Sequence, residues 1–425
     1  MKSTKAATIA EGAVTKSITQ RVASNFGWSI VSEAIGKGVF FITNIYLART
    51  LGVENFGLFT LAQTITFYFW LAVDLGTNMY GIREIAKDKE NSEETINPLL
   101  TLRITAGFIV FSLYVISLFI LGMPAIKRLT FAGCGLYLLT YAFYSDWVLK
   151  GIEKFKYIAF GSFVSSIAFL VGTIYLVRTN NDVTIASFIW SSSYLLGSIS
   201  LLYFLYRKLG IKYRPSFNFK IWVSHIKESI YFTISGSLMV IYQYLPILLL
   251  SIFFTNYEVG IFSAPYRIII TVCSAGFLLP MAFYPVFSEL YEKDKVRFLR
   301  NQKIFRRFMI AVGLIVATLG IIFSEKVIIL LFGTQYISSV PVFQIILLLV
   351  PLYFLRYTYG TLLLATGYQR HHNIATFSGL AGMVFNGLLL IPWKGLFGAA
   401  MALLAAEVIM VSSMFLLADL TFKRR

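Results

Sequence analysis

The chain has 425 residues, of which 57% are hydrophobic and 13% charged, and 37 Lys and Arg against 20 Asp and Glu give a formal net charge of +17. Soluble domains carry about 25% charged residues, so this composition excludes an ordinary soluble enzyme, and a disordered chain would be polar. The positive charge lies in short stretches between long apolar runs, which excludes a continuous nucleic-acid-binding surface. A polytopic helical membrane protein remains.

Residues 1–24 are polar and basic, and the apolar run that follows, from Phe26 to Leu47, exceeds the roughly 7–15 residues of a signal-peptide core. We therefore expect a retained first span behind a cytoplasmic tail. A transmembrane helix needs ~20 mainly apolar residues. Runs of this kind predict twelve spans, at residues 26–48, 58–82, 101–122, 130–149, 157–177, 183–206, 229–253, 258–287, 307–323, 339–364, 373–391 and 396–419.

Lys and Arg concentrate in every second connecting segment. If the N-terminus is cytoplasmic, the cytoplasmic segments carry 28 of these residues, Arg103 among them, and the outside segments carry six. Basic residues that flank spans are retained on the cytoplasmic side. The distribution therefore predicts that both termini are cytoplasmic and that the outside loops are short.

The two halves of the chain share a faint repeat. Residues 54–62 (ENFGLFTLA) align with residues 257–265 (YEVGIFSAP) at a shift of 203, which pairs Gly57 with Gly260. A second match, at a shift of 216, pairs Gly151 with Gly367, again at corresponding places in the two halves.

This repeat predicts an all-α fold in which twelve transmembrane helices form two six-helix bundles around a central cavity. Residues 25–206 would form the N-terminal bundle and residues 228–425 the C-terminal bundle, joined by a basic cytoplasmic linker at residues 207–227. Because six is even, the two halves share one orientation. Transporters built in this way bind their substrate between the halves and rock one half against the other.

Three cations lie inside predicted spans, where a charge costs ~2.5–3.5 kcal/mol on insertion scales and usually has a function. Lys37 follows Glu33 by about one helical turn, so it either neutralises that carboxylate or faces the cavity and binds phosphate. Arg267 has no acid within one turn, which leaves a cavity-facing role or a pair with another helix. Arg356 lies among tyrosines and either binds an anion or stacks on a ring.

Three carboxylates also lie inside the predicted spans. Asp74 is a candidate proton or cation site, the alternative being that it satisfies local backbone groups. Asp146, beside Trp147, is either a second such site or an interfacial residue, and both roles remain open for Glu407. Two cysteines in apolar runs, three His at span ends and the absence of a P-loop motif predict no disulfide, metal site or ATP hydrolysis. We expect no cofactor.

Several segments resemble Wzx-type polysaccharide-precursor (O-antigen) flippases of the multidrug/oligosaccharidyl-lipid/polysaccharide exporter superfamily. The segments are ARTLGVENFGLFTLA (48–62), DLG (74–76), GIREIAK (81–87), YEVGIFSAPYR (257–267), LLLATGYQR (362–370) and GLFGAAMALLAAE (395–407). The resemblance implies two six-helix bundles around a cavity. It also implies an activity that moves undecaprenyl-pyrophosphate-linked oligosaccharide from the inner to the outer leaflet by alternating access, without catalysis of a reaction.

The resemblance further implies a multi-pass protein of the bacterial cytoplasmic (inner) membrane that serves lipopolysaccharide or other surface-polysaccharide biosynthesis. Its partners would be the lipid bilayer, the lipid-linked oligosaccharide and other polysaccharide-assembly membrane proteins. Lys37, Arg267 and Arg356 would bind the pyrophosphate, and Asp74 or Glu407 would couple transport to an ion or proton. Four tyrosines at inner depths of the spans would stack on sugars: Tyr242, Tyr244, Tyr353 and Tyr357.

Two other functions remain as alternatives. A drug or cation exporter of the same superfamily would favour acidic residues in its cavity, whereas basic residues are comparably prominent here. A membrane-embedded polysaccharide polymerase or transferase would need a large outside loop or a group of carboxylates and histidines at one face, and the sequence predicts neither.

Overall fold

The computed structural model describes the backbone of residues 2–423 and, within it, the side chains of residues 27–28, 32, 34–230, 233 and 236–420. All regular elements in this range are helical. They are α1 (Lys2–Asp74), α2 (Thr77–Lys87), α3 (Ser92–Ile120), α4 (Ala125–Gly135), α5 (Tyr137–Ala142), α6 (Asp146–Gly151), α7 (Phe155–Leu176), η1 (Asn180–Asp182), α8 (Val183–Tyr203), η2 (Phe204–Lys208), α9 (Phe219–Phe253), α10 (Asn256–Lys293), α11 (Lys295–Ile322), α12 (Ser324–Phe332), η3 (Thr334–Ser339), α13 (Val340–Leu347), α14 (Leu349–Ala365) and α15 (Gln369–Lys423).

Nine helical segments of the described residues are long and apolar enough to cross a membrane. They are Ala34–Asp74, Ser92–Ile120, Phe155–Leu176, Asn180–Lys208, Gly236–Phe253, Asn256–Lys293, Lys295–Ile322, Thr334–Ala365 and Gln369–Leu420. The predicted all-helical, multi-pass membrane protein is therefore confirmed.

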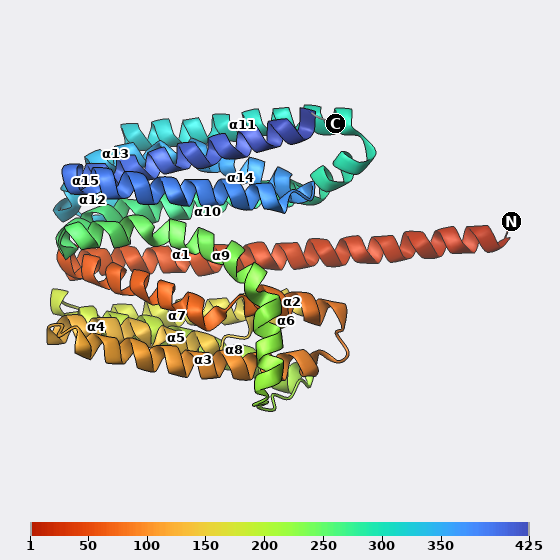
Figure 1. The fold of residues 1–425 in the computed structure, drawn as a ribbon, viewed down its shortest axis with the longest axis horizontal. Helices are drawn as coiled ribbons and strands as arrows, with labels where there is room; N and C mark the ends of the chain where they lie inside the picture. The colour runs from red at the N-terminus through yellow and green to blue at the C-terminus, as the bar shows by residue number, and fades with distance from the viewer. Residues whose placement is uncertain (1, 424–425) are drawn as a thin grey trace.

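Two of these segments contain a break. Gly52 (φ 73°, ψ 174°) interrupts α1, and Gly395 (φ 55°, ψ −126°) interrupts α15. Both positions need backbone angles that glycine adopts at little cost. The segments are 41 and 52 residues long, and a helix of 40 residues spans about 60 Å, twice the ~30 Å of hydrocarbon. Figure 1 shows the chain turning back along itself at each break.

The predicted span at residues 130–149 is not one helix. It is divided into α4, α5 and α6, with breaks at Leu136 and at residues 143–145. Hydroxyl groups of α8 bind carbonyl oxygens near these breaks: Ser191 donates to Cys134 O (3.0 Å), and Ser198 donates to Thr140 O (2.9 Å). Backbone groups freed within a membrane protein need such partners, because no water is available to them.

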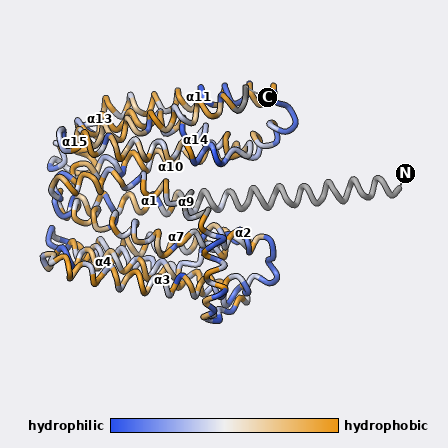
Figure 2. The backbone as a smooth tube through the Cα atoms, in the orientation of Figure 1, coloured by the Kyte–Doolittle hydropathy of each residue, from blue (hydrophilic) through white to orange (hydrophobic). Residues whose placement is uncertain are grey.

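The helices form two groups with α1 and α9 between them. Figure 1 shows α2–α8 on one side and α10–α15 on the other, and α1 packs against both α7 and α10. The end that holds the C-terminus and the α2–α3 connection is called the terminal end here, and the end that holds Gly52 and Gly395 the opposite end. Figure 2 shows hydrophobic residues along the helices and hydrophilic ones mainly at the two ends.

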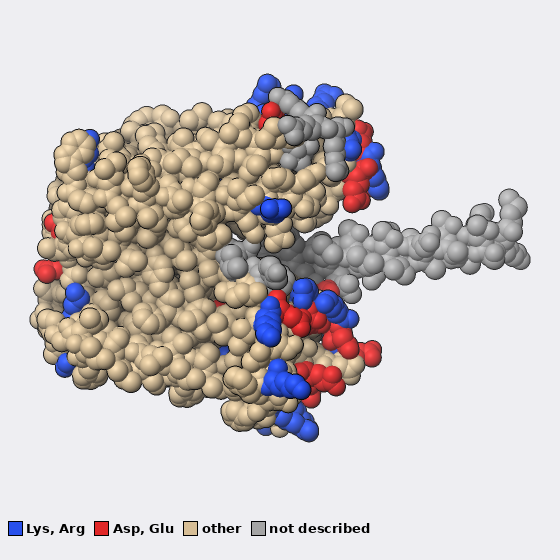
Figure 3. Space-filling view, viewed as in Figure 1, with Lys and Arg blue, Asp and Glu red and all other residues tan. Residues whose placement is uncertain are grey.

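The surface between the two ends is apolar. Figure 3 shows Lys, Arg, Asp and Glu gathered mainly at the terminal end, with few charges over the rest of this face. Large apolar side chains are exposed on this lateral surface, among them Phe160, Leu314 and Phe385. Such a surface is stable in a lipid bilayer, where the exposed side chains contact hydrocarbon.

Candidate functional site

A cavity of about 430 Å³ lies between the two groups of helices. It is lined by the first leg of α1 (the part before Gly52) and its second leg (the part after Gly52), by α7, α8, α9 and α10, and by Tyr144 of the segment between α5 and α6. Lys37 and Arg267 are the charged side chains among the described residues that line it, and no carboxylate is among them. The cavity is therefore a polar space with a positive electrostatic character.

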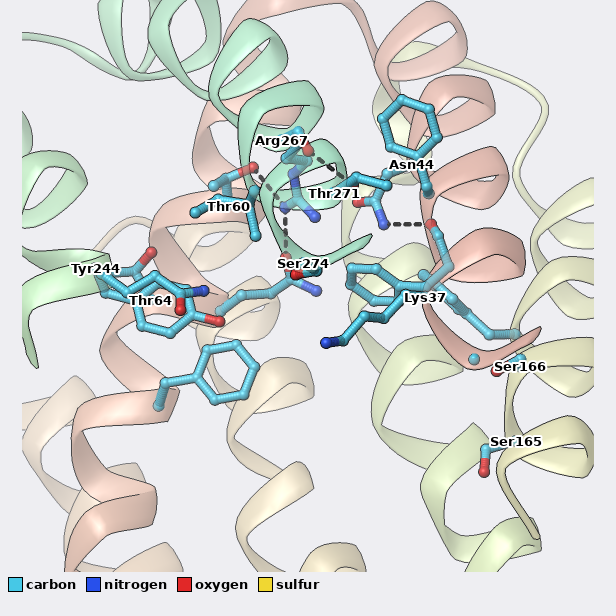
Figure 4. A pocket seen from close by; sticks show the side chains of 18 of the residues that line it. Lys37, Asn44, Thr60, Thr64, Ser165, Ser166, Tyr244, Arg267, Thr271 and Ser274 are labelled. Carbon is cyan, nitrogen blue, oxygen red and sulfur yellow. Dashed lines mark hydrogen bonds between the residues drawn. The ribbon is translucent and has the colours of Figure 1, made fainter. Parts of the chain in front are cut away.

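Arg267 is held by neutral partners from α1. Its Nη2 donates to Gln63 Oε1 (2.7 Å) and to Thr60 Oγ1 (3.1 Å), as Figure 4 shows. The guanidinium lies 5.2 Å from the ring centre of Phe56 and 5.8 Å from that of Phe40. None of these partners carries a negative charge, so the position of Arg267 is fixed while its charge remains available to an anion.

Lys37 reaches the same cavity from the first leg of α1. Its side chain is exposed, and Figure 4 shows it extending toward the space below Arg267. The alternative role of Lys37 was to neutralise Glu33, whose side chain lies outside the described residues. The structure thus places two of the three predicted phosphate-binding cations in one cavity.

The rest of the lining is rich in hydroxyl and amide groups. The polar side chains other than tyrosine are Asn44, Thr60, Gln63, Thr64, Ser162, Ser165, Ser166, Ser193, Gln243, Thr271 and Ser274. Several buried atoms of this set have no hydrogen-bond partner among the described residues, namely Asn44 Oδ1, Gln63 Nε2 and Thr64 Oγ1, and the same is true of Arg267 Nε. A ligand with many hydroxyl or phosphoryl oxygens would satisfy such groups.

Tyrosines line the cavity, but mostly not the predicted ones. Of the four tyrosines considered in the sequence, Tyr244 lines it and stacks on Phe67 with ring centres 4.7 Å apart. Tyr242 is not in the lining because residues two apart on a helix point in different directions. Tyr353 and Tyr357 also lie elsewhere. The other tyrosines of the lining, Tyr144, Tyr194 and Tyr266, went unnoticed in the sequence.

Arg356 does not line the cavity. Its Nη1 lies 3.1 Å from Glu407 Oε2, and the same oxygen accepts a 2.6 Å hydrogen bond from the Tyr242 hydroxyl. The guanidinium lies 4.2 Å from the ring centre of Tyr353 and 5.1 Å from that of Tyr357. The side chains of the ion pair are 8% and 0% exposed. The structure therefore joins two residues that the sequence analysis treated separately, one as a phosphate ligand and one as a coupling site.

Asp74 also forms an ion pair, with Arg103 (Nη1 to Oδ1, 3.5 Å). Arg103, counted in the sequence among the basic residues of a connecting segment, does not lie in one. It lies inside α3, is 0% exposed, and has its guanidinium near the rings of Tyr141 and Trp147. The apolar run begins at about residue 101, but α3 begins nine residues earlier, at Ser92. Hydropathy therefore placed Arg103 at the start of a span, whereas it lies about three helical turns inside the helix.

Asp146 pairs with a residue on its own helix. Lys150 Nζ lies 2.6 Å from Asp146 Oδ2, in the i,i+4 spacing that favours such pairs. Lys150 is 36% exposed, so the pair lies near the surface of the molecule. This geometry agrees with the interfacial alternative for Asp146.

Close packing of α1 against α10 closes the cavity toward the opposite end. The α1–α10 contact at Gly57 and Gly260 lies on the closed side, as does the edge-to-face contact of Phe56 with Tyr336. Along α1 the lining changes from buried Asn44 to exposed Lys37 in the direction of the terminal end. Figure 3 shows a hollow between the two groups of helices at that end.

The sequence and the fold match known transport proteins. The family model for "Polysaccharide biosynthesis protein" matches residues 22–291. The "Putative O-antigen transporter" of Escherichia coli (strain K12) is 27% identical over 391 residues, which are 88% of this chain and 91% of that protein.

Two solved structures share the fold. An inward-facing multidrug resistance MATE family transporter of the MOP superfamily superposes with a TM-score of 0.74 at 15% identity, covering 92% of this chain and 95% of that one. The lipid II flippase MurJ, in an inward closed conformation, gives a TM-score of 0.70 at 15% identity, covering 92% and 87%. These proteins are transporters and flippases rather than enzymes. The chain belongs to the polysaccharide biosynthesis protein family and has the fold of MOP-superfamily transporters.

Proposed function

We propose that this protein is a flippase that moves an undecaprenyl-pyrophosphate-linked oligosaccharide, an O-antigen or related repeat unit, from the inner to the outer leaflet of the bacterial inner membrane. The observation that carries the proposal is the cavity that contains Lys37 and Arg267, many hydroxyl and amide groups, and no carboxylate among its described lining residues. The E. coli relative is named a putative O-antigen transporter and MurJ a lipid II flippase, and these names support the proposal.

The chemistry of the lining suits a pyrophosphate with sugars attached. Each hydroxyl moved into hydrocarbon without a hydrogen bond costs several kcal/mol, roughly 2–7, so an oligosaccharide needs a polar path. Arg267 and Lys37 would bind the pyrophosphate, since cations form strong charge-assisted hydrogen bonds with phosphate oxygens. Tyr144, Tyr194 and Tyr244 would lie against the sugars, while the polyprenyl tail stays in the bilayer.

Alternating access needs two bodies that move. We infer twelve crossings in two six-helix bundles, at residues 25–206 and 228–425, with residues 207–227 between them and residues 1–24 as a cytoplasmic tail. The breaks at Gly52 and Gly395 each divide a segment long enough to cross twice, which makes eleven crossings of the nine segments, and the divided span α4–α6 would be the twelfth. The terminal end would be cytoplasmic, since most of the Lys and Arg lie there (Figure 3). The cavity would then be open to substrate on the cytoplasmic side.

Two buried ion pairs are candidate coupling sites. Among the described residues, Glu407 Oε1 accepts no hydrogen bond, and Asp74 Oδ1 faces Arg103 Nη1 at 3.5 Å without forming a hydrogen bond, so either carboxylate is a candidate to take up a proton or a cation. Export of an anionic headgroup is also assisted by an inside-negative potential, at ~2.3 kcal/mol per charge per 100 mV. Imposing a potential and a pH gradient separately across proteoliposomes distinguishes these sources of energy.

The cavity gives no specific support to a drug or cation exporter. An organic cation would need a carboxylate or an uncharged aromatic box, whereas Lys37 and Arg267 would repel it. The similarity to the MATE transporter concerns the fold alone.

The test is a flipping assay in proteoliposomes with a fluorescent short-chain polyprenyl-pyrophosphate saccharide. Wild-type protein is expected to expose the label to an external quencher, and R267A and K37A are expected to lower the rate at least tenfold. Lys326→Ala, which removes a cation near the opposite end and outside the cavity lining, is the matched control. Full activity of both cavity variants would overturn the proposal.

A further inference from the structure

The segment between α8 and α9 is fixed on the face of α3. Backbone N–H groups of alternate residues donate to side chains spaced four apart on α3. The bonds are Lys212 N to Glu93 Oε1 (2.9 Å), Arg214 N to Asn97 Oδ1 (2.9 Å) and Ser216 N to Thr101 Oγ1 (3.0 Å). Two residues of extended chain advance about 6.6 Å and four residues of helix about 6 Å, so the spacings match. This segment, residues 210–218, is called the strap.

The first turns of α9 are fixed in the same way. Trp222 Nε1 donates to Ser216 O (3.1 Å), and Ser229 Oγ donates to Leu75 O (2.7 Å). The hydroxyl of Tyr80 lies 3.0 Å from His225 Nδ1. In Figure 1 this part of α9 runs across the ends of the neighbouring helices rather than along them. One face of this part of α9 therefore packs against α2, α3 and the end of α1. These contacts fix the rotation of the helix and so determine which residues lie on its outer face.

The outer face carries two phenyl rings beside two lysines. Phe217 and Phe219 are each 75% exposed. They line one shallow hollow of about 760 Å³ together with Lys220 and Lys227. The remaining lining residues are Asn218, Val223 and Ser224, so no acidic side chain is among the described residues that line the hollow. Residues 207–227 as a whole contain six Lys and Arg and no Asp or Glu.

The hollow lies at the level where the apolar lateral surface meets the charged end. In the lower group of helices, Figure 3 shows Lys and Arg along this boundary and Asp and Glu mostly farther out. In a bilayer this level is that of the phosphate groups, where phenyl rings reach hydrocarbon and lysines remain in the headgroup layer. Anionic lipids attract basic residues placed there.

We propose that the strap and the first turns of α9 form a docking site for an anionic phospholipid of the cytoplasmic leaflet. Lys220 and Lys227 bind the headgroup phosphate, and Phe217 and Phe219 insert beside its acyl chains. The site is separate from the cavity and needs no flipping activity, although the choice of leaflet rests on the proposed cytoplasmic position of the terminal end. The hollow has two hydroxyl or amide side chains, Asn218 and Ser224, against eleven in the cavity besides the tyrosines, which favours a phospholipid over the sugar-bearing substrate.

The test places an environment-sensitive fluorophore at Ser224→Cys in the full chain, reconstituted in phosphatidylcholine vesicles. Cys134 and Cys273 are buried and should not react. Acyl-brominated phosphatidylglycerol is then added at increasing mole fraction, and brominated phosphatidylcholine in a parallel series. We expect saturable quenching with at least a fivefold preference for phosphatidylglycerol. Equal quenching by the two lipids overturns the proposal.

Two double variants separate charge from apolar insertion. Lys220→Gln with Lys227→Gln should abolish the preference for phosphatidylglycerol, while Phe217→Ser with Phe219→Ser should weaken quenching by both lipids. Lys295→Gln with Lys303→Gln removes the same charge from α11 and should change neither. A preference retained by the Lys220/Lys227 variant, or lost in the α11 control, contradicts the assignment.

Unlabelled undecaprenyl pyrophosphate distinguishes the two sources of lipid phosphate. If it relieves the quenching at a lower mole fraction than unlabelled phosphatidylglycerol does, the site belongs to the substrate and the proposal fails. The same quenching measured on R267A separates this inference from the flippase proposal. If R267A loses flipping but keeps the quenching, both proposals are supported. If the wild-type protein shows the quenching but does not flip the substrate, the lipid site is supported and the flippase proposal fails.

Discussion

Gly57 and Gly260 pack against each other where α1 and α10 meet, at the closed side of the cavity. A Cβ atom on Gly57 would overlap the carbonyl oxygen of Asn256, and a Cβ atom on Gly260 would overlap that of Val53. These are the two glycines that the internal repeat pairs at a shift of 203. Equivalent positions of the two halves of the sequence therefore approach each other backbone to backbone.

A side chain at either glycine should open this contact. We expect Gly57→Ala or Gly260→Ala to separate α1 from α10, because the overlapping atoms are backbone and have no rotamer to change. In proteoliposomes, a cysteine at Thr60 should then react with an impermeant maleimide from the side of the opposite end, at a rate at least fivefold above that of the glycine parent. Gly38→Ala has open space around it and should keep the parental rate, with helix stability raised by about 0.5–1 kcal/mol. Unchanged labelling of all variants would contradict the closing role.

Two helix ends cap each other beside this contact. Arg49 donates from Nε to Leu331 O (2.8 Å) and from Nη2 to Leu330 O, near the end of α12. In return, Gln335 Nε2 donates to Arg49 O (3.2 Å). Terminal carbonyls of a helix lack partners within the helix, so each side supplies donors to the other.

Removing these caps should weaken the closed state. We expect Arg49→Ala and Gln335→Ala each to lower the thermal stability of the protein by roughly 1 kcal/mol, the net value of a hydrogen bond. Arg49→Lys should recover only part of the loss, because an ammonium group cannot hold two carbonyl oxygens in the geometry of a guanidinium. The measurement is thermal unfolding in detergent, with Lys326→Ala, which removes an exposed cation, as the control. Full recovery by Arg49→Lys would show that charge alone matters.

Arg267, which lines the cavity, and Arg356, which does not, should respond differently to replacement by alanine. Arg356→Ala leaves Glu407 buried without its partner, so we expect a loss of about 3–5 kcal/mol in stability. Arg356→Met with Glu407→Gln should recover most of this loss. Arg267→Ala removes hydrogen bonds to neutral partners and should leave a folded protein that does not transport. Thermal unfolding and flipping measured on the same preparations check both expectations, and equal destabilisation by the two single variants would refute the distinction.

Docking of α9 should depend on pH through His225. Burial lowers the pKa of His225, and the nearby carboxylates of Glu228 and Glu84 oppose this shift only in part. The Tyr80 hydroxyl lies 3.0 Å from His225 Nδ1, and Arg83 Nη2 lies 3.9 Å from the Glu228 carboxylate. The folded state disfavours the protonated ring, so stability is complete above the unfolded value of about 6.5 and falls as the pH decreases below it.

Limited proteolysis of the strap between pH 5 and 7.5 measures this effect. The wild-type cleavage rate should rise as the pH falls, because a protonated His225 weakens the contact of α9 with α2. His225→Gln should give a rate that is flat across this range, and Lys227→Gln should keep the wild-type profile. A wild-type rate that is independent of pH would exclude His225 as the cause.

Much of this protein follows from the linear order of its residues. Long apolar runs with few charges determine a helical membrane protein, because only internally hydrogen-bonded segments are stable in hydrocarbon. The motifs around Gly57 and Gly260 led to the family, and the depth of Lys37 and Arg267 in their spans identified them as residues of a cavity.

Only the tertiary structure decided which side chains meet. Arg356 lies as deep in its span as Arg267, yet it faces Glu407 inside its own group of helices, and Tyr244 lines the cavity where Tyr242 does not. Arg103 is buried against Asp74 although it stands at the start of an apolar run. Hydropathy determines how far a residue lies along the membrane normal, because transfer from water to lipid depends on composition. The partner of a side chain depends on the direction in which it points from its helix, and this direction changes by about 100° from one residue to the next. The rotation of the helix as a whole is set by packing against neighbours that are distant in the sequence.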